Sequence, residues 1–257
     1  MFRLALIPLG LLLALIVGSV IALIAGLEWS DLTALLHDRE IRFAVSMSIS
    51  TALSSLILSF LISLPAAWAI VRRQVIMRRF INVLLDVPMV TPPLVIGIGL
   101  LLLLGTKGPI GGNLPTFASA LFSPLGVVIA QTYVASAIMV RSAISALSAI
   151  DKKYISTAYN LGLTPAKTFL LVEIPLCWRP LLGGCIIAFS RAIGEFGATL
   201  MLAGATRLKT ETLPMAVYLN IASGEFNKAI SCAVILICIA VLLLITLHFV
   251  QGSNKHD

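Results

Sequence analysis

Two residues of opposite charge lie four positions apart in an otherwise uncharged stretch, SRAIGEFGATLMLAG (190–204). On a helix, Arg191 and Glu195 would share one face, where a cation and a carboxylate can pair. A charge at the centre of a bilayer costs about 2.5–3.5 kcal/mol on insertion scales, and such residues usually mark a path for a substrate, ion or proton. The pair therefore indicates either a structural or gating contact or a substrate site, and we predict the structural or gating role.

The composition places these charges in a membrane protein. Of the 257 residues, 59% are hydrophobic and 11% are charged, whereas soluble domains carry about 25% charged residues. The first apolar run, Leu4–Leu27, exceeds the roughly 7–15 residues of a signal-peptide core, so we expect a retained helix. Uncharged runs longer than about 18 residues are candidate transmembrane helices. The sequence predicts an all-α polytopic membrane protein with six transmembrane helices, at about 4–27, 45–71, 82–105, 124–146, 177–203 and 229–250.

Basic residues predict how these helices cross the membrane. The formal net charge is +7, with four arginines in residues 72–79 and five Lys or Arg in residues 141–179. Lys and Arg concentrate in cytoplasmic loops. A multi-pass protein of a prokaryotic plasma (inner) membrane with both termini in the cytoplasm satisfies this rule, and nucleic-acid binding is not needed to explain the charge. The weakest fit is the last outer loop, where the basic and acidic residues are Arg207, Lys209, Lys228, Glu211 and Glu225.

Prolines interrupt the third predicted helix. Pro88, Pro92 and Pro93 each lack a backbone donor, so the helix should bend or break there. A broken helix is tolerated at membrane depth where it is buried in protein or lines a watery cavity. Asp86 is expected to form a structural ion pair with the arginines at 78–79.

The second predicted helix is rich in small hydroxyl residues, with eight Ser or Thr between positions 46 and 63. Such residues allow close helix contact and hydrogen bonds between helices. We predict that they serve packing; the alternative is that they line a polar path.

One segment, residues 151–176, is too interrupted to cross the membrane. Asp151 can cap a helix, and Gly162 can end it in the left-handed conformation. Thr164 then offers a second N-cap, with Pro165 at the favoured first helical position. We expect two short cytoplasmic helices joined by a tight bend, with Pro175 marking the return to the membrane. The exposed tip would carry Tyr159, Asn160, Leu161 and Gly162.

A pair of projecting helices can dock in a groove of another protein, although an ordinary loop is the alternative. This segment resembles the cytoplasmic loop of ABC importer permeases, which reads Glu-Ala-Ala, three residues, Gly, and later Leu-Pro. Ser156, Thr157 and Ala158 occupy the first three positions, Gly162 the glycine, and Ile174-Pro175 the end. The resemblance implies a coupling helix that sits in a cleft of an ATPase subunit.

The resemblance extends over about residues 43–250 as a permease core, preceded by a span and outer loop at 1–42, in a single ABC transmembrane domain (1–257) with the coupling loop at 151–175. The run Arg-Ala-x-Gly-Glu-Phe-Gly-Ala (191–198) is similar to that of oxyanion permeases, most of all the molybdate form; sulfate and tungstate permeases are the alternatives. The resemblance implies a homodimer in the lipid bilayer, an ATP-binding subunit dimer and an extracytoplasmic oxyanion-binding protein.

The chain offers no nucleotide site of its own. The nearest match to a phosphate-loop pattern, Gly99–Gly108, has the wrong spacing, and the three histidines lack metal-ligand spacing. We therefore expect a permease subunit that is not an enzyme and holds no metal or cofactor, with ATP and Mg on the partner ATPase. A rival from another class is an ion-coupled secondary transporter, in which Arg191 and Glu195 would form a substrate or proton site.

A doubly negative oxyanion needs weak contacts if it is to leave again. Hydroxyl groups and backbone donors exposed by glycine suit such a passage, and pairing with Arg191 would cancel much of the repulsion from Glu195. The residues predicted for the translocation path or gate are Thr91, Pro92, Pro93, Ser190, Arg191, Gly194, Glu195, Gly197 and Thr199.

Overall fold

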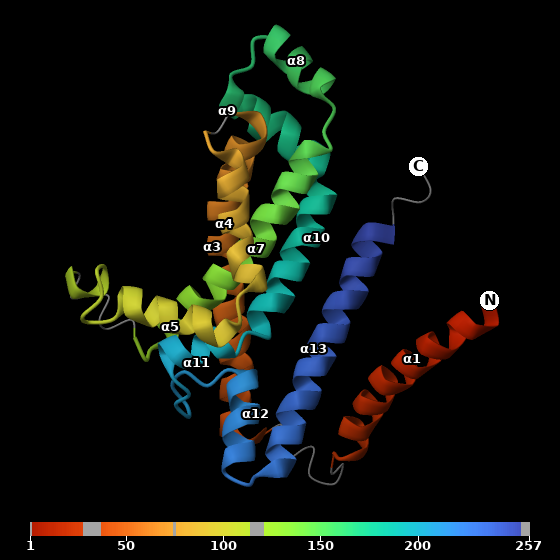
Figure 1. Ribbon diagram of the computed structural model, residues 1–257, viewed down its shortest axis with the longest axis vertical. Helices are drawn as coiled ribbons and strands as arrows, with labels where there is room; N and C mark the ends of the chain where they lie inside the picture. The colour runs from red at the N-terminus through yellow and green to blue at the C-terminus, as the bar shows by residue number, and fades with distance from the viewer. Residues whose placement is uncertain (1, 28–36, 74–75, 114–120, 253–257) are drawn as a thin grey trace.

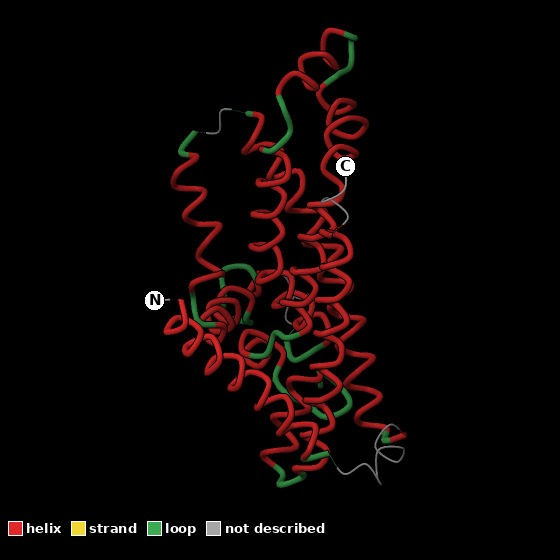
Figure 2. Tube along the Cα trace, turned by 90° about the vertical axis from the view of Figure 1, so that its right-hand side faces the viewer, coloured by secondary structure: helices red, strands yellow, loops and turns green. Residues whose placement is uncertain are grey.

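The computed structural model describes residues 2–27, 37–73, 76–113 and 121–252, and these residues form helices and loops without a strand (Figure 2). The order of elements along the chain is α1 (Phe2–Ala25), α3 (Arg39–Arg72), α4 (Arg78–Val90), α5 (Pro93–Leu104), the 3₁₀ turn η2 (Gly111–Asn113), α7 (Pro124–Ser148), α8 (Lys152–Asn160), α9 (Pro165–Thr168), the π-helical turn η3 (Phe169–Glu173), α10 (Ile174–Ile193), α11 (Gly197–Ala203), α12 (Leu213–Ala222) and α13 (Phe226–Gly252).

Five segments are long and apolar enough to cross a membrane, and the bent pair α4–α5 makes six if it counts as one span. This confirms the predicted all-α polytopic fold. Helices α3, α7 and α10 pack side by side along the long axis of the molecule (Figure 1). Helices α8 and α9 lie at one end of this bundle and α12 lies near the other, while α5 and α11 run across it at mid-height.

The third predicted helix is broken, as its prolines indicated. Helix α4 ends at Val90 and α5 begins at Pro93, and the two axes differ by 113°. Thr91 and Pro92 adopt extended ψ angles of 135° and 134°, because the residue before a proline is disfavoured in the helical region. Residues 82–105 are therefore two helices, and the second one turns toward α11.

Three of the eight hydroxyl residues of α3 serve packing against α7, as predicted. Ser55, Ser59 and Ser63 lie four residues apart and donate to successive carbonyl oxygens of α7, at 3.1, 3.3 and 3.2 Å. All three are buried. Their small side chains let the two helices approach closely, so the stripe forms the α3–α7 seam.

The predicted partner of Asp86 was wrong. Its carboxylate pairs with Arg141 of α7, whose guanidinium also donates to the Asn82 carbonyl at 2.6 Å. Arg141 is 55 residues away in sequence, so local spacing favoured the nearer arginines at 78–79. The pair is structural, as expected, and it holds α4 against α7.

Candidate functional site

The segment 151–168 forms the predicted projection at one end of the molecule (Figures 1 and 2). The Asp151 carboxylate caps α8 by accepting the Lys153 N–H at 3.0 Å. Gly162 ends the turn at φ +83°, and the Thr164 hydroxyl accepts the Lys167 N–H at 3.4 Å, with Pro165 in the first helical turn. The four predicted tip residues, Tyr159, Asn160, Leu161 and Gly162, are exposed, as are Ser156 and Thr157 at the start of the predicted coupling loop, whereas Ala158 packs inward.

The two short helices joined by a tight bend are present as predicted, as α8 and α9, but the second one does not end before the membrane helix. Helix α9 passes through the π-helical turn η3 into α10, so that residues 165–193 form one 29-residue helical segment. Pro175 lies at the junction of η3 and α10, where it removes a backbone donor from the segment, and Cys177 two residues later has non-helical angles (φ −116°, ψ 17°), so the segment is kinked there. The projection is therefore continuous with a membrane helix.

A buried ion pair that sequence reasoning missed anchors the base of the projection. Glu173 in η3 is fully buried and accepts from Arg72 Nε at 2.9 Å and from Trp68 Nε1 at 3.3 Å. Arg72 also donates to the Leu147 carbonyl at 2.8 Å. The contacts join the ends of α3 and α7 to the turn before α10. The only sequence signal was a lone glutamate in the apolar run FLLVEIPL (169–176).

Arg191 and Glu195 pair as predicted, with Nη1 and Oε2 2.6 Å apart. The helix expected over 177–203 is interrupted at the pair: α10 ends at Ile193 and α11 begins at Gly197. Glu195 is fully buried, and its Oε1 accepts the Ala198 N–H at 2.9 Å. The carboxylate thus satisfies a free donor in the first turn of α11 as well as neutralising Arg191.

Thr91, Pro92 and Pro93 meet Arg191 at a cavity of about 300 Å³ beside the break between α4 and α5. Among the described residues, no other residue predicted for the path lines this cavity. The cavity therefore combines one guanidinium, one hydroxyl and the backbone of a broken helix, which is a setting that an anion can enter.

The other predicted path residues have different surroundings. Ser190 donates to the Ile186 carbonyl at 2.9 Å, and Thr199 is fully buried. A Cβ on Gly197 would come within 2.9 Å of Pro93 Cβ, so this glycine permits close contact between α11 and α5. Gly194 ends α10 at the interruption. In this conformation these four residues do not line the cavity beside Arg191.

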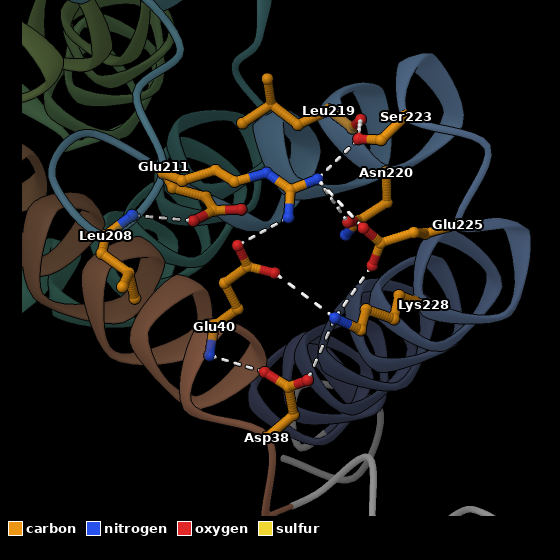
Figure 3. Close-up of polar contacts among 10 residues, drawn as sticks. Asp38, Glu40, Leu208, Glu211, Leu219, Asn220, Ser223, Glu225 and Lys228 are labelled. Atoms are coloured by element: carbon orange, nitrogen blue, oxygen red, sulfur yellow. Dashed lines mark hydrogen bonds and ion pairs between the residues drawn. The ribbon is translucent and has the colours of Figure 1, made fainter.

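At the opposite end of the bundle from α8, an ion-pair network explains the poor fit of the last outer loop to the charge rule (Figure 3). Arg207 pairs with Glu40 at 2.7 Å, and Lys228 pairs with Asp38 at 3.3 Å and Glu225 at 2.9 Å. Two of the three basic residues of this loop, Arg207 and Lys228, are thus matched by carboxylates at the start of α3 and in the turn before α13. The network ties three segments that are distant in sequence.

Two carboxyls of this outer region have shifted pKa values. The hydrogen bond from Lys228 lowers the pKa of Glu225, whereas burial raises the pKa of Glu211. Glu211 accepts the Leu208 N–H at 3.0 Å, which holds the loop between α11 and α12. Among the described residues, no group of three or more His, Cys, Asp or Glu is placed to hold a metal ion.

Residues 59–253 match the family described as the inner membrane component of binding-protein-dependent transport systems. The chain belongs to this family. The permease is similar to the molybdenum transport system permease protein ModB of Mycobacterium tuberculosis, at 32% identity over 88% of this chain and 85% of the relative. ModB of Haemophilus influenzae is 33% identical over 78% of this chain and 90% of that protein. A relative from Nephroselmis olivacea, described as a sulfate transport system permease protein, is 27% identical over 82% of this chain and 75% of its own length.

Solved structures show the same fold. A chain of a bacterial alginate ABC transporter, crystallised with its periplasmic protein, aligns with this permease at a TM-score of 0.74 and 15% identity, covering 99% of this chain and 94% of that chain. A chain of the MetNI methionine ABC transporter aligns at 0.59 and 16% identity, covering 83% and 92%. Together with the family match and the ModB relatives, this makes the chain an inner-membrane ABC permease subunit, a membrane transport component.

Proposed function

We propose that this permease imports molybdate as a homodimer driven by separate ATPase subunits, which bind ATP and Mg, and supplied by an extracytoplasmic oxyanion-binding protein. The observation that carries the proposal is the exposed α8 turn, which projects from the bundle and continues through η3 into α10 (Figure 1). The ModB relatives support molybdate as the substrate.

The helical segment 165–193 gives a physical route from the projection to the cavity. Its 29 residues form a helical connection that is kinked at Cys177. One end follows the α8 turn, and the other end carries Arg191. Movement of α8 on an ATPase would therefore displace the guanidinium relative to Thr91 and Pro93, opening or closing the passage.

The side chains around the passage suit weak and transient binding of a tetrahedral dianion. Arg191 attracts the anion, while the adjacent Glu195 carboxylate reduces the net field of the site. The Thr91 hydroxyl can donate a hydrogen bond from the break between α4 and α5. An anion that is only partly neutralised can then move on toward the cytoplasm.

The function is tested by uptake into vesicles that contain the permease with its copurifying ATPase and binding protein. We expect ATP-dependent accumulation of labelled molybdate in preference to sulfate, with tungstate as a competitor. Preferential sulfate uptake would instead make the permease a sulfate importer, the function described for the Nephroselmis relative. Uptake that needs an ion gradient and no ATP would refute the ABC mechanism.

Gly162→Val is expected to lower ATP-driven uptake about tenfold or more while leaving the bundle folded. The left-handed conformation costs an L-residue about 1–2 kcal/mol, and a β-branched side chain is disfavoured further. No atom lies within 4 Å of the added Cβ, so the substitution alters the backbone of the α8 turn alone. Uptake and ATPase stimulation are the measurements.

Gly224→Val is the matched control for this variant. Gly224 has φ +79° and similarly open surroundings, but it lies in the turn between α12 and α13 at the other end of the bundle. Equal strain there should leave uptake near the wild-type value. Normal uptake by Gly162→Val would remove the α8 turn from the coupling mechanism.

A further inference from the structure

An apolar cavity of about 460 Å³ lies between α3, α4, α5 and α7 and adjoins the cavity beside Arg191 at Pro88, which lines both. Leu58, Ile62 and Ala66 line it from α3, and Leu84 and Pro88 line it from α4. From Leu58 to Ala66 the cavity follows α3 for about 12 Å at the helical rise of 1.5 Å per residue. It is thus elongated along the membrane normal.

The cavity lies beside α4, a helix that the rest of the chain leaves largely uncovered. Helix α4 has no buried residue along its 13 residues, and Val83 and Leu84 are 63% and 51% exposed. The Arg141 contacts with Asp86 and the Asn82 carbonyl hold α4 on α7. The lining is mostly apolar, with hydroxyl groups from Ser63, Thr132, Tyr133 and Ser136 on its α3 and α7 sides, so an apolar chain suits the cavity better than water does.

A basic site lies at the end of the cavity nearest α8. Arg78 and Arg79 begin α4, and both are exposed. Six residues separate Arg78 from Leu84, which corresponds to about 9 Å of helix. Among the described residues, neither arginine takes part in an ion pair. Their guanidinium groups are therefore available for an anion at the membrane surface.

The neighbouring charges are already matched. Arg72 is held by Glu173, the Arg73 guanidinium lies 5.9 Å from the Trp68 ring centroid, and Asp86 is paired with Arg141. The charge at the entrance is consequently positive. Guanidinium groups bind phosphate through paired hydrogen bonds, and basic sites between membrane helices on the cytoplasmic side recognise anionic headgroups.

We propose that the groove between α3, α4 and α7 binds one anionic phospholipid, with an acyl chain in the cavity and its phosphate on Arg78 and Arg79. The apolar cavity supplies a surface for the chain, and the arginines select the headgroup. The lipid would support the α4–α7 contact beside the broken helix. This site is independent of which oxyanion the permease transports.

The full-length permease, purified in detergent, is titrated with phosphatidylglycerol and separately with phosphatidylcholine, and bound lipid is counted by native mass spectrometry. Each basic residue near an anionic lipid surface contributes about a fivefold change in affinity. Arg78→Gln/Arg79→Gln should therefore weaken phosphatidylglycerol binding by about 25-fold and leave phosphatidylcholine binding unchanged. The matched control Lys107→Gln removes an exposed cation beyond the end of α5 and should change neither.

Ala66→Phe fills the cavity and should weaken the binding of both lipids, since the acyl chain loses its place. The double arginine variant alters only exposed side chains, so it decides the proposal even if Ala66→Phe does not fold. Wild-type affinity for phosphatidylglycerol in the arginine variant overturns the proposal. Conversion of a dimer to a monomer by Ala66→Phe, with lipid retained, would assign the groove to a second copy of the permease and also overturn it.

Discussion

Glu173→Leu is expected to destabilise the permease by about 3–5 kcal/mol, because it leaves the guanidinium of Arg72 without its buried carboxylate. The two side chains are 0% and 13% exposed, so water cannot replace the lost partner. The Trp68 indole N–H loses its acceptor as well. The free energy of unfolding in detergent, measured with wild type in parallel, gives the magnitude.

Two further variants identify the cause of this loss. Arg72→Met/Glu173→Leu removes both charges and should recover most of the stability, because apolar replacement of a complete buried pair is often neutral. Asp86→Asn breaks a pair whose side chains are 30% and 46% exposed, so its cost should be within about 1 kcal/mol. If Glu173→Leu and Asp86→Asn lowered the free energy of unfolding equally, burial would not explain the importance of the Arg72–Glu173 pair.

The amount of substrate taken up per ATP hydrolysed provides a second test of the Glu173 contacts. They tie η3 to the ends of α3 and α7, so the double apolar variant tests whether the charges serve more than stability. If the pair transmits movement from α8 to α10, the folded double variant should hydrolyse ATP in the assembled transporter with reduced uptake per ATP. Unchanged uptake per ATP would restrict the pair to a stabilising role.

Glu195→Gln is expected to lower uptake by roughly ten- to hundredfold, since hydrogen bonds to charged groups contribute about 1.5–3 kcal/mol. The amide oxygen can still accept the Ala198 N–H, so the first turn of α11 is preserved. Arg191 loses its counter-charge, however, and lines the cavity with its full positive field. An oxyanion should then bind more tightly and leave more slowly.

Comparison with two other substitutions separates charge from helix capping at this position. Glu195→Leu removes both contacts and should also destabilise the fold, by about 3–5 kcal/mol. Glu225→Gln makes the same chemical change in the exposed outer network and should have little effect on uptake. If Glu195→Gln leaves folding, ATP coupling and uptake unchanged, the Arg191–Glu195 pair has no part in gating.

Much of the fold follows from local sequence. Uncharged runs marked the membrane helices, because a helix in lipid forms all of its backbone hydrogen bonds within its own run of residues. The Asp151 cap, the Gly162 turn and the Thr164–Pro165 start were also predictable, since each depends on residues within one helical turn. The break at the prolines of the third predicted helix was predictable for the same reason.

Contacts between distant residues were not predictable in this way. The pairs Arg72–Glu173 and Asp86–Arg141 join residues 101 and 55 positions apart, and composition does not specify which charges meet. The helix interruption at Glu195 is likewise decided by packing, because α11 must turn to place Gly197 against Pro93.

The sequence by itself therefore determined the membrane class, the helix-breaking residues, the projecting turn and the possibility that Arg191 and Glu195 pair. Only the tertiary structure decided that Arg191 shares a cavity with Thr91, that Glu195 also holds α11, and that Glu173 anchors the projection. The physical reason is range: caps, turns and hydrophobic runs act within a few residues, whereas burial and ion pairing depend on which helices pack together.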